Sequence, residues 1–192
     1  LAWSDFAYPL QNPTDSAAAA TALFTGEKTN NGRIAVSADA SSRYSSLSEK
    51  AQLVDKAVGA VTSVYLSHAT PGAWMSHNAA RGNGFAIADE GLWGNPNTTG
   101  TITEDGRYEG SFGNSMPQDV IIGAGHPAWN GGSYVNTNMR DKLANESGQP
   151  DDFLFVERIA DNEDGGARLI NAANLMTTTR LAGLFGGTGG NL

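Results

Sequence analysis

Short apolar runs alternate with segments of helical spacing along most of the chain. The run 60–67 is rich in β-branched residues, whereas Met139 and Leu143 are spaced like one face of a helix. The run 119–125 is apolar at successive positions and ends in glycines, which is typical of a buried parallel strand. The pattern predicts strands over 60–67, 119–125, 152–158 and 180–185, helices over 48–57, 71–81, 136–146 and 168–177, a short helix near 85–90, and an acidic turn at 161–166.

Strands that alternate with helices indicate an α/β domain with a mainly parallel sheet flanked by helices. In such sheets, functional residues gather at the carboxyl ends of the strands. The segment 67–71 follows the first predicted strand at such an end. The chain shows no internal repeat and no linker, so its 192 residues are expected to belong to a single domain.

The segment 14–26 has the features of a helix whose first turn carries a serine. Thr14, Asp15 or Ser16 can cap the helix, the alanines that follow favour it, and Gly26 ends it. A helix start has unpaired N–H donors and partial positive charge, which suit an anion. Ser16 could therefore attack a phosphate group, or it could serve only as a cap, which is the commoner role for a serine at a helix start.

Composition excludes several classes of protein and site. The net charge is −8, with only 12 Lys and Arg residues and no basic run, which argues against a nucleic-acid-binding surface. The absence of cysteine excludes disulfides and thiolate metal sites. No stretch approaches the roughly 20 apolar residues needed to cross a bilayer, so no membrane partner is expected.

Four segments, in order along the chain, resemble the alkaline phosphatase family. Residues 15–32 resemble its nucleophile segment, with Asp-Ser-Ala-Ala followed by Thr-Gly-Glu-Lys-Thr-Asn-Asn-Gly. The sequence His-Ala-Thr-Pro at 68–71, with Arg81 beyond it, resembles the stretch where a strand ends in Asp or His before Ala-Thr-Pro and a helix. Residues 119–127 resemble the hydrophobic strand that precedes a glycine turn, and residues 181–191 resemble a Gly-Leu-Phe segment of the bacterial members.

The resemblance implies metal-dependent hydrolysis of small phosphate monoesters through a phosphoserine intermediate on Ser16. Arg81 would bind two phosphate oxygens through its planar fork. Zn²⁺ and Mg²⁺ are the implied cofactors, with Ser16, Thr70 and His68 as the implied metal-site residues of this chain. Thr70 would bind Mg²⁺ through its hydroxyl, and His68 would lie beside the third metal site, as a ligand or through water. Asp15 would be a structural neighbour.

The same residues have roles that need no chemistry. Thr70 precedes a proline and is in a common position for a helix cap, and Arg81 could be a solvated or ion-paired side chain. His77 and His126 match no local metal motif and are expected to be structural. Glu157, at the end of a predicted strand, is expected to be a surface acid.

The family's zinc ligands match no residue of this sequence. Residues 1–192 are therefore expected to form a partial domain, without the N-terminal strand and the C-terminal metal-ligand region of the family, and to be inactive or nearly so alone. Loss of those strands would leave open sheet edges. The resemblance also implies a homodimer and a periplasmic or secreted location.

Other functions stay open at this point. A phosphodiesterase or sulfatase-like relative would share the fold, although such enzymes typically use threonine or a modified residue as nucleophile. An α/β fragment could bind an anion at the start of the first helix without turnover. The acidic surface, rich in Asn and Gly, also suits a structural or adhesive exported domain.

Overall fold

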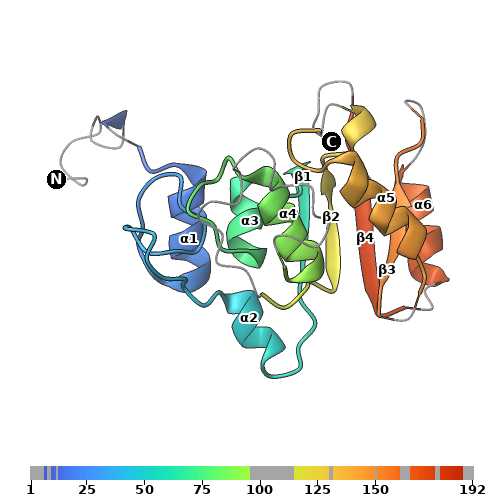
Figure 1. Ribbon diagram of the computed structural model, residues 1–192, viewed down its shortest axis with the longest axis horizontal. Helices are drawn as coiled ribbons and strands as arrows, with labels where there is room; N and C mark the ends of the chain where they lie inside the picture. Colours follow the sequence, from blue (N-terminus) through green and yellow to red (C-terminus); the bar gives the residue numbers. More distant parts are fainter. Residues whose placement is uncertain are drawn as a thin grey trace.

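The computed structural model describes residues 7, 10, 11, 13–95, 115–129, 132–149, 151–160, 165–175 and 178–187. Within these ranges four strands form one sheet in the order β1-β2-β4-β3, and every neighbouring pair is parallel. The strands are β1 (Gly59–Tyr65), β2 (Val120–Ala124), β3 (Phe153–Glu157) and β4 (Arg180–Phe185) (Figure 1). The predicted α/β class with a parallel sheet is confirmed, and all four strands match their predicted positions closely.

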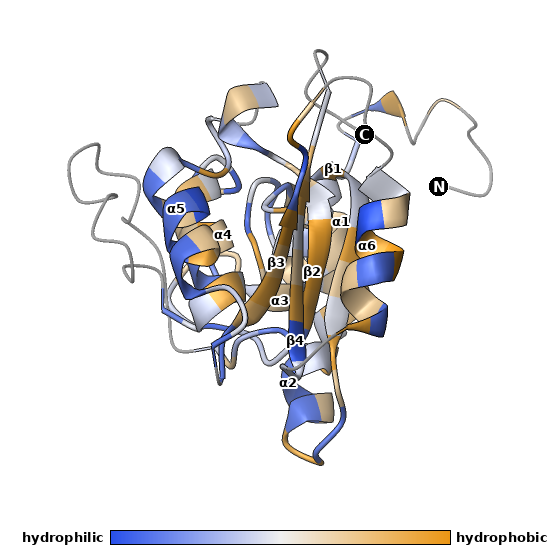
Figure 2. Ribbon diagram, turned by 90° about the vertical axis from the view of Figure 1, so that its right-hand side faces the viewer, coloured by the Kyte–Doolittle hydropathy of each residue, from blue (hydrophilic) through white to orange (hydrophobic). Residues whose placement is uncertain are grey.

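Helices cover both sides of this sheet. They are α1 (Ser16–Thr25), α2 (Leu47–Gln52), α3 (Ala69–Met75), α4 (Gly84–Trp93), α5 (Thr137–Glu146) and α6 (Gly165–Asn174), with a short 3-10 helix at Pro127–Trp129. Helices α4 and α5 lie on one side and α6 lies on the other (Figure 2). Helix α3 packs on β1, and α1 packs on α3, so α1 lies far from β3 (Figure 1).

The apolar core has two parts, one on each side of the sheet. The larger part joins α1, α3, α4 and α5 to the strands and includes Ile87, Met139 and Leu143. The smaller part lies under α6, where Leu169 packs against a cluster that contains Phe185. The predicted inward positions of α5 are confirmed, because Met139 and Leu143 are 0% and 3% exposed. The strands are accordingly more hydrophobic than the helices that flank them (Figure 2).

Helix α1 forms as its sequence predicts, and the structure selects one of the three possible caps. The Asp15 side chain accepts a hydrogen bond from the N–H of Ala18, so Asp15 is the N-cap and Ser16 is the first helical residue. Gly26 ends the helix in the left-handed conformation, with φ 83°, and its N–H donates to Ala22. The interpretation of Ser16 as a cap is therefore wrong.

Helix α2 is shorter than the predicted helix over 48–57, and its buried face is polar. Leu47 and Val54 are 51% and 64% exposed, whereas Ser48 and Glu49 are buried. A capping box holds this turn, because Ser46 accepts from the N–H of Glu49 while the Glu49 carboxylate accepts from the N–H of Ser46. Hydrogen bonding, which apolar periodicity does not detect, decides which face of α2 points inward.

Helix α3 begins and ends earlier than predicted. It starts at Ala69 instead of Pro71, after His68 in extended conformation, and it ends at Met75. Ser76 is extended and its hydroxyl donates to the carbonyl of Gly72, which closes the last turn. Arg81 therefore lies beyond the helix that was predicted to carry it.

Two further predictions differ in their boundaries. The short helix predicted near 85–90 is longer in the structure, where α4 spans Gly84–Trp93. Helix α6 begins at Gly165 instead of residue 168. Gly165 and Gly166 thus belong to a helix and not to the predicted acidic turn, whose residues 161–164 lie outside the described part of the chain. The stretch 83–113, whose many Gly, Asn and Thr residues predict mostly loop, lies outside the described part of the chain from residue 96 onward.

The core assignment predicts different costs for two identical substitutions on helices. Leu143→Ala should lower the free energy of unfolding by about 2–5 kcal/mol, because it leaves a cavity in the larger core. Leu23→Ala is the matched control: Leu23 is 69% exposed on α1, and the change should cost within about 0.5 kcal/mol. Denaturant unfolding of both variants measures the difference, and equal losses would contradict this placement of the core.

Candidate active site

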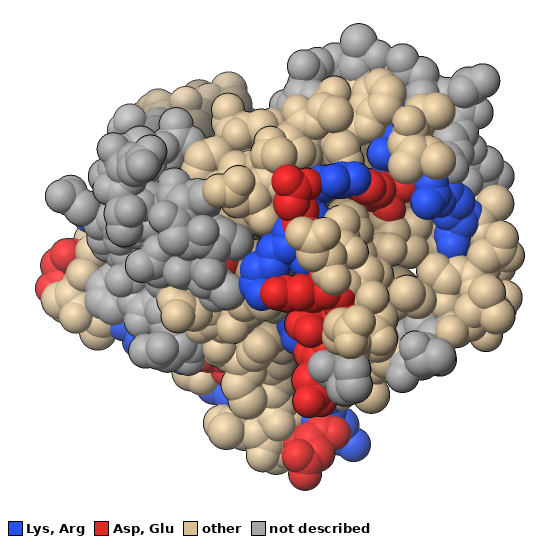
Figure 3. Space-filling view, turned by 45° about the vertical axis from the view of Figure 1, so that its right-hand side comes forward, with Lys and Arg blue, Asp and Glu red and all other residues tan. Residues whose placement is uncertain are grey.

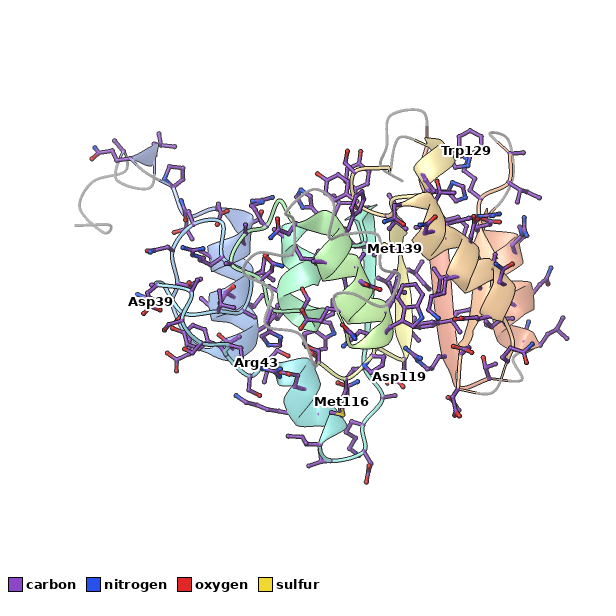
Figure 4. The ribbon with its side chains drawn as sticks, in the orientation of Figure 1. Asp39, Arg43, Met116, Asp119, Trp129 and Met139 are labelled. Carbon is purple, nitrogen blue, oxygen red and sulfur yellow. The ribbon has the colours of Figure 1, made fainter. Side chains whose placement is uncertain are left out.

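The carboxyl ends of the strands meet at one edge of the sheet. Tyr65, Ala124 and Phe185 are aligned across β1, β2 and β4. In Figure 4 the labelled Asp119, before β2, lies at the lower end of the sheet, and Trp129, after β2, lies at the upper end. The segments that follow the strands are thus brought to the upper edge, where functional residues of parallel sheets gather.

Asp15 joins three segments at the start of α1. One carboxylate oxygen accepts from the N–H of Ala18 at 2.9 Å, and the other accepts from the N–H of Gly32 at 2.9 Å. The second oxygen also lies 3.1 Å from Nη1 of Arg81 in an ion pair. Partial burial by itself raises the pKa of Asp15, but the hydrogen bonds from Ala18, Arg81 and Gly32 and the charge of Arg81 lower it below its ordinary value. Asp15 thus caps the helix that begins at Ser16 and pairs with Arg81.

Ser16 and Arg81 lie in direct contact although 65 positions separate them in the chain. Nη1 of Arg81 donates to Oγ of Ser16 at 2.8 Å. Ser16 occupies the first turn of α1, where unpaired backbone N–H groups carry partial positive charge. A hydroxyl, a guanidinium and a helix start thus converge at one place, and together they suit a phosphate group.

His68 completes this group from the end of β1. Its Nε2 lies 3.3 Å from Nη2 of Arg81, and because a guanidinium is only a donor, this nitrogen is the acceptor. Burial, together with the charge of Arg81, lowers the pKa of His68. His68 is therefore a neutral imidazole near neutral pH, and the lone pair of its Nε2 accepts the hydrogen bond from Arg81.

A hollow of about 400 Å³ opens beside these residues. It is lined by His68, Arg81, Gly82, Asn83, Ser133 and Tyr134. The Tyr134 ring stacks on that of Tyr65, with centroids 3.9 Å apart and an angle of 10° between the planes. Its main-chain carbonyl accepts from the Ser67 hydroxyl at 3.1 Å, so both ring and backbone are held in place. Neither the motifs nor the resemblance indicated Tyr134, because its proximity depends on the segment after β2.

Thr70 is placed differently from the other candidate residues. It is exposed, at the second position of α3, and lines a hollow of about 300 Å³ whose other residues include Phe24 and Trp74. The N-cap position belongs to His68, so the interpretation of Thr70 as a helix cap is wrong. The structure brings Ser16, Arg81 and His68 together, whereas Thr70 lines a separate hollow.

Two histidines outside this group are buried, and each contacts a glutamate. His77, 1% exposed, contacts Glu90, and His126, 6% exposed, contacts Glu157. These contacts agree with the structural roles expected for both histidines. The expectation that Glu157 is a surface acid is wrong, because its side chain is 14% exposed and also pairs with Arg140.

The described ranges contain no group of three or more His, Asp or Glu side chains placed to hold a metal ion. No helix in the described part of the chain combines the length and apolar character needed to cross a membrane. On the face drawn in Figure 3, basic side chains are interspersed with acidic ones and form no broad basic area.

Comparison with known proteins identifies the family. Residues 7–187 match the family described as alkaline phosphatase, which is nearly the whole chain. This protein belongs to the alkaline phosphatase family. It is 48% identical over 82 residues to alkaline phosphatase 3 of Bacillus subtilis (strain 168) and 43% identical over 81 residues to alkaline phosphatase 4 of the same organism. These two matches cover 43% and 42% of this chain.

Solved alkaline phosphatases have the same fold. The cold-active enzyme from the psychrophile Shewanella sp. superposes with a TM-score of 0.59 at 23% identity, over 92% of this chain and 33% of its own. The enzyme of the Antarctic bacterium TAB5 gives 0.56 at 21% identity, over 91% of this chain and 40% of its own. The Thermus thermophilus enzyme gives 0.57 at 22% identity, over 93% of this chain and 29% of its own.

The matches span only part of each relative. They cover 18% and 17% of the two Bacillus proteins and at most 40% of the three solved enzymes. The activity, substrates and partners of the whole protein therefore belong to the proposals below.

The contacts of Asp15 predict that its substitutions differ in cost. Asp15→Ala removes the cap of α1 and should lower the free energy of unfolding by about 0.5–2 kcal/mol. Asp15→Asn keeps an oxygen that can cap, so it should cost less while still removing the charge beside Arg81. Glu27→Ala, an exposed acid just past α1, is the control and should change stability least. Denaturant unfolding gives this order, and a loss for Asp15→Ala no larger than for Glu27→Ala would contradict it.

Proposed function

We propose that this alkaline phosphatase family member hydrolyses phosphate monoesters through a phosphoserine on Ser16. The observation that carries this proposal is the 2.8 Å hydrogen bond from Nη1 of Arg81 to Oγ of Ser16 at the start of α1. A guanidinium that donates to a hydroxyl oxygen stabilises negative charge as it develops there. The same group can bind phosphate oxygens, so one arginine would bring substrate and nucleophile together.

The reaction proceeds in two displacements. Oγ of Ser16 forms a bond to phosphorus as the bond from phosphorus to the ester oxygen breaks, and the alcohol leaves with the proton that the hydroxyl loses. Water then attacks the phosphoserine, the bond from phosphorus to Oγ breaks, and Ser16 regains its proton as inorganic phosphate forms. Arg81 stabilises charge on the phosphoryl oxygens in both steps, while Asp15 holds its guanidinium in place.

The hollow beside Arg81 is the proposed place for the organic group of the substrate. Tyr134, stacked on Tyr65, gives this hollow one rigid aromatic wall. Asn83 and Ser133 add polar groups along the same lining. Small phosphate monoesters fit these dimensions and this mixed character.

Metal dependence is part of the proposal, although the described residues do not themselves form a metal site. Ser16 and His68 would each supply one donor atom at the site, and a neutral imidazole is the form of histidine that binds metals. Thr70, which lines a separate hollow, would supply a hydroxyl oxygen from there. Two solved variants of the TAB5 enzyme, in which a histidine is replaced by aspartate or glutamate, have Mg²⁺ bound in a site called M3. We propose Zn²⁺ and Mg²⁺ as cofactors, with zinc ligands from other parts of the whole protein. A homodimeric state and a periplasmic or secreted location belong to the same proposal.

A second candidate function is anion binding without turnover. It is favoured by one observation, namely that the described residues provide an anion site of Arg81 and a helix start but no metal cluster. This candidate needs no reaction at Ser16, so replacement of that hydroxyl separates the two functions.

Ser16→Ala should abolish turnover in the whole protein and leave phosphate binding largely intact. Loss of the nucleophile should reduce kcat by about 10³-fold or more, because no phosphoserine can form. Arg81 and the start of α1 remain, so the affinity for inorganic phosphate should change little. Steady-state hydrolysis of a phosphate monoester and calorimetric titration with phosphate measure the two effects.

Ser63→Ala provides the control, since Ser63 is exposed on β1. Its kcat and phosphate affinity should equal those of the unmodified protein. Unchanged hydrolysis in Ser16→Ala would exclude Ser16 as the nucleophile. Phosphate binding without hydrolysis in the unmodified protein, supplied with Zn²⁺ and Mg²⁺, would favour the anion-binding candidate.

Removal of metal should separate the same candidates in another way. Treatment of the whole protein with a chelator should abolish hydrolysis, and addition of Zn²⁺ with Mg²⁺ should restore it. The anion-binding candidate predicts no such dependence, because Arg81 binds phosphate without metal. Hydrolysis that survives thorough chelation, as confirmed by metal analysis, would contradict metal dependence.

A further inference from the structure

A buried group of charged side chains lies outside the proposed reaction. The His77 side chain is 1% exposed and lies between Glu49 of α2 and Glu90 of α4. The side chain of Glu90 is fully buried and that of Glu49 is 10% exposed. Buried charges are costly without partners, so this arrangement needs a reason.

Both ring nitrogens of His77 face hydrogen-bond acceptors. Nδ1 lies 3.0 Å from Oε1 of Glu90, and Nε2 lies 3.0 Å from the carbonyl oxygen of Tyr44. The Ser115 hydroxyl donates its proton to the same Glu90 oxygen at 2.6 Å. The lone pairs of Ser115 Oγ can therefore accept from Nδ1 of His77 at 3.1 Å. A neutral imidazole has one N–H, so two acceptor-facing nitrogens require the doubly protonated ring.

The charges around this ring are balanced. Two carboxylates face it, those of Glu90 and, at 3.4 Å from Nε2, Glu49. Glu49 also pairs with Arg43, labelled in Figure 4, and accepts from the N–H of Ser46. Burial by itself lowers the pKa of His77, but the hydrogen bonds and charges of Glu49 and Glu90 raise it to about 9. Two cations thus balance two buried anions below that pH.

His77 also anchors the backbone that leads to Arg81. His77 follows the last turn of α3, and its backbone N–H donates to Oε2 of Glu90 at 3.1 Å. The next residue, Asn78, exchanges two backbone hydrogen bonds of 2.9 Å with Ile34. The N–H of Arg81 then donates to the carbonyl of Gly32 at 2.7 Å. No helix holds residues 77–81, so these bonds fix the segment.

We propose that His77, as an imidazolium buried between Glu49 and Glu90, is a positioning residue that fixes segment 77–81 and thereby the guanidinium of Arg81. The functional part of this inference rests on the proposed role of Arg81 in phosphate binding. Deprotonation leaves two buried carboxylates beside one remaining cation, Arg43. The stabilisation by His77 is therefore fully present below the ordinary histidine pKa and is lost as pH rises through about 9.

Amide hydrogen exchange in the whole protein tests the anchor without reference to activity. In His77→Gln, the amides of Asn78 and Arg81 should exchange at least about tenfold faster near neutral pH, because a charged anchor is lost. The amide of Leu181, bonded to Asp119 across the sheet, is the internal reference and should change less.

His126→Gln is the matched control variant. His126 is also buried and bonded to a glutamate, but no described contact links it to residues 77–81. Exchange at Asn78 and Arg81 should stay as in the unmodified protein. Equal acceleration in both variants, or none in folded His77→Gln, overturns the inference.

The unmodified protein provides a second test that needs no variant to fold. Exchange at Asn78 and Arg81 should accelerate through about pH 9 by more than exchange at Leu181, which reports the acceleration by hydroxide that all amides share. Parallel acceleration of all three amides overturns the inference.

Titration with inorganic phosphate separates this inference from the proposed function. Both Arg81→Ala and His77→Gln should weaken phosphate binding, by about tenfold or more, and His126→Gln should not. If Arg81→Ala binds phosphate as the unmodified protein does, the proposed function fails, while hydrogen exchange still decides the role of His77. If Arg81→Ala weakens binding and folded His77→Gln does not, the positioning role is overturned.

Discussion

The candidate active site depends on the carboxylate of Asp15. One of its oxygens caps α1, and the other holds both the N–H of Gly32 and the guanidinium of Arg81. Three segments that are distant in the chain are thereby fixed to the residue immediately before Ser16. Because hydrogen bonds and the charge of Arg81 lower the pKa of Asp15, its charge persists through the range in which most enzymes work. The Ser16–Arg81 contact is therefore set by a neighbouring side chain that has no chemical role in the proposed reaction.

Polar side chains make up part of the interior between α2, α3 and α4. Ser48 and Glu49 turn inward from α2, while Leu47 remains exposed. The inward carboxylate meets His77, which follows α3 directly. Such a network costs stability unless each member is bonded, and it specifies one arrangement of α2, α3 and α4 when it is. The boundaries of α2 and α3 and the position of Arg81 follow from this network.

The sequence predicted those parts of the molecule that local patterns determine. Strands such as 119–125 were found because they are continuous apolar runs, and α1 because its cap and Gly26 are local signals. The sequence could not predict the ends of α3 or the burial of Glu157, which depend on partners distant in the chain. Within the site, the order of the motifs along the chain and their resemblance to the family indicated Ser16 and Arg81, which the fold brings into contact. The ion pair by which Asp15 holds Arg81 and the place of Tyr134 beside the site are properties of the folded chain alone.

The sheet has a consequence for how the protein reaches this state. Gly59 pairs with Val120, and Val120 pairs with Leu181, so neighbouring strands are joined by long stretches of chain. Each pairing requires closure of a long loop before any hydrogen bond of the ladder can form. Helix α1, whose cap and stop are local, has no such requirement. Folding should therefore be slow for a chain of this size, with the helix that begins at Ser16 able to form well before the sheet.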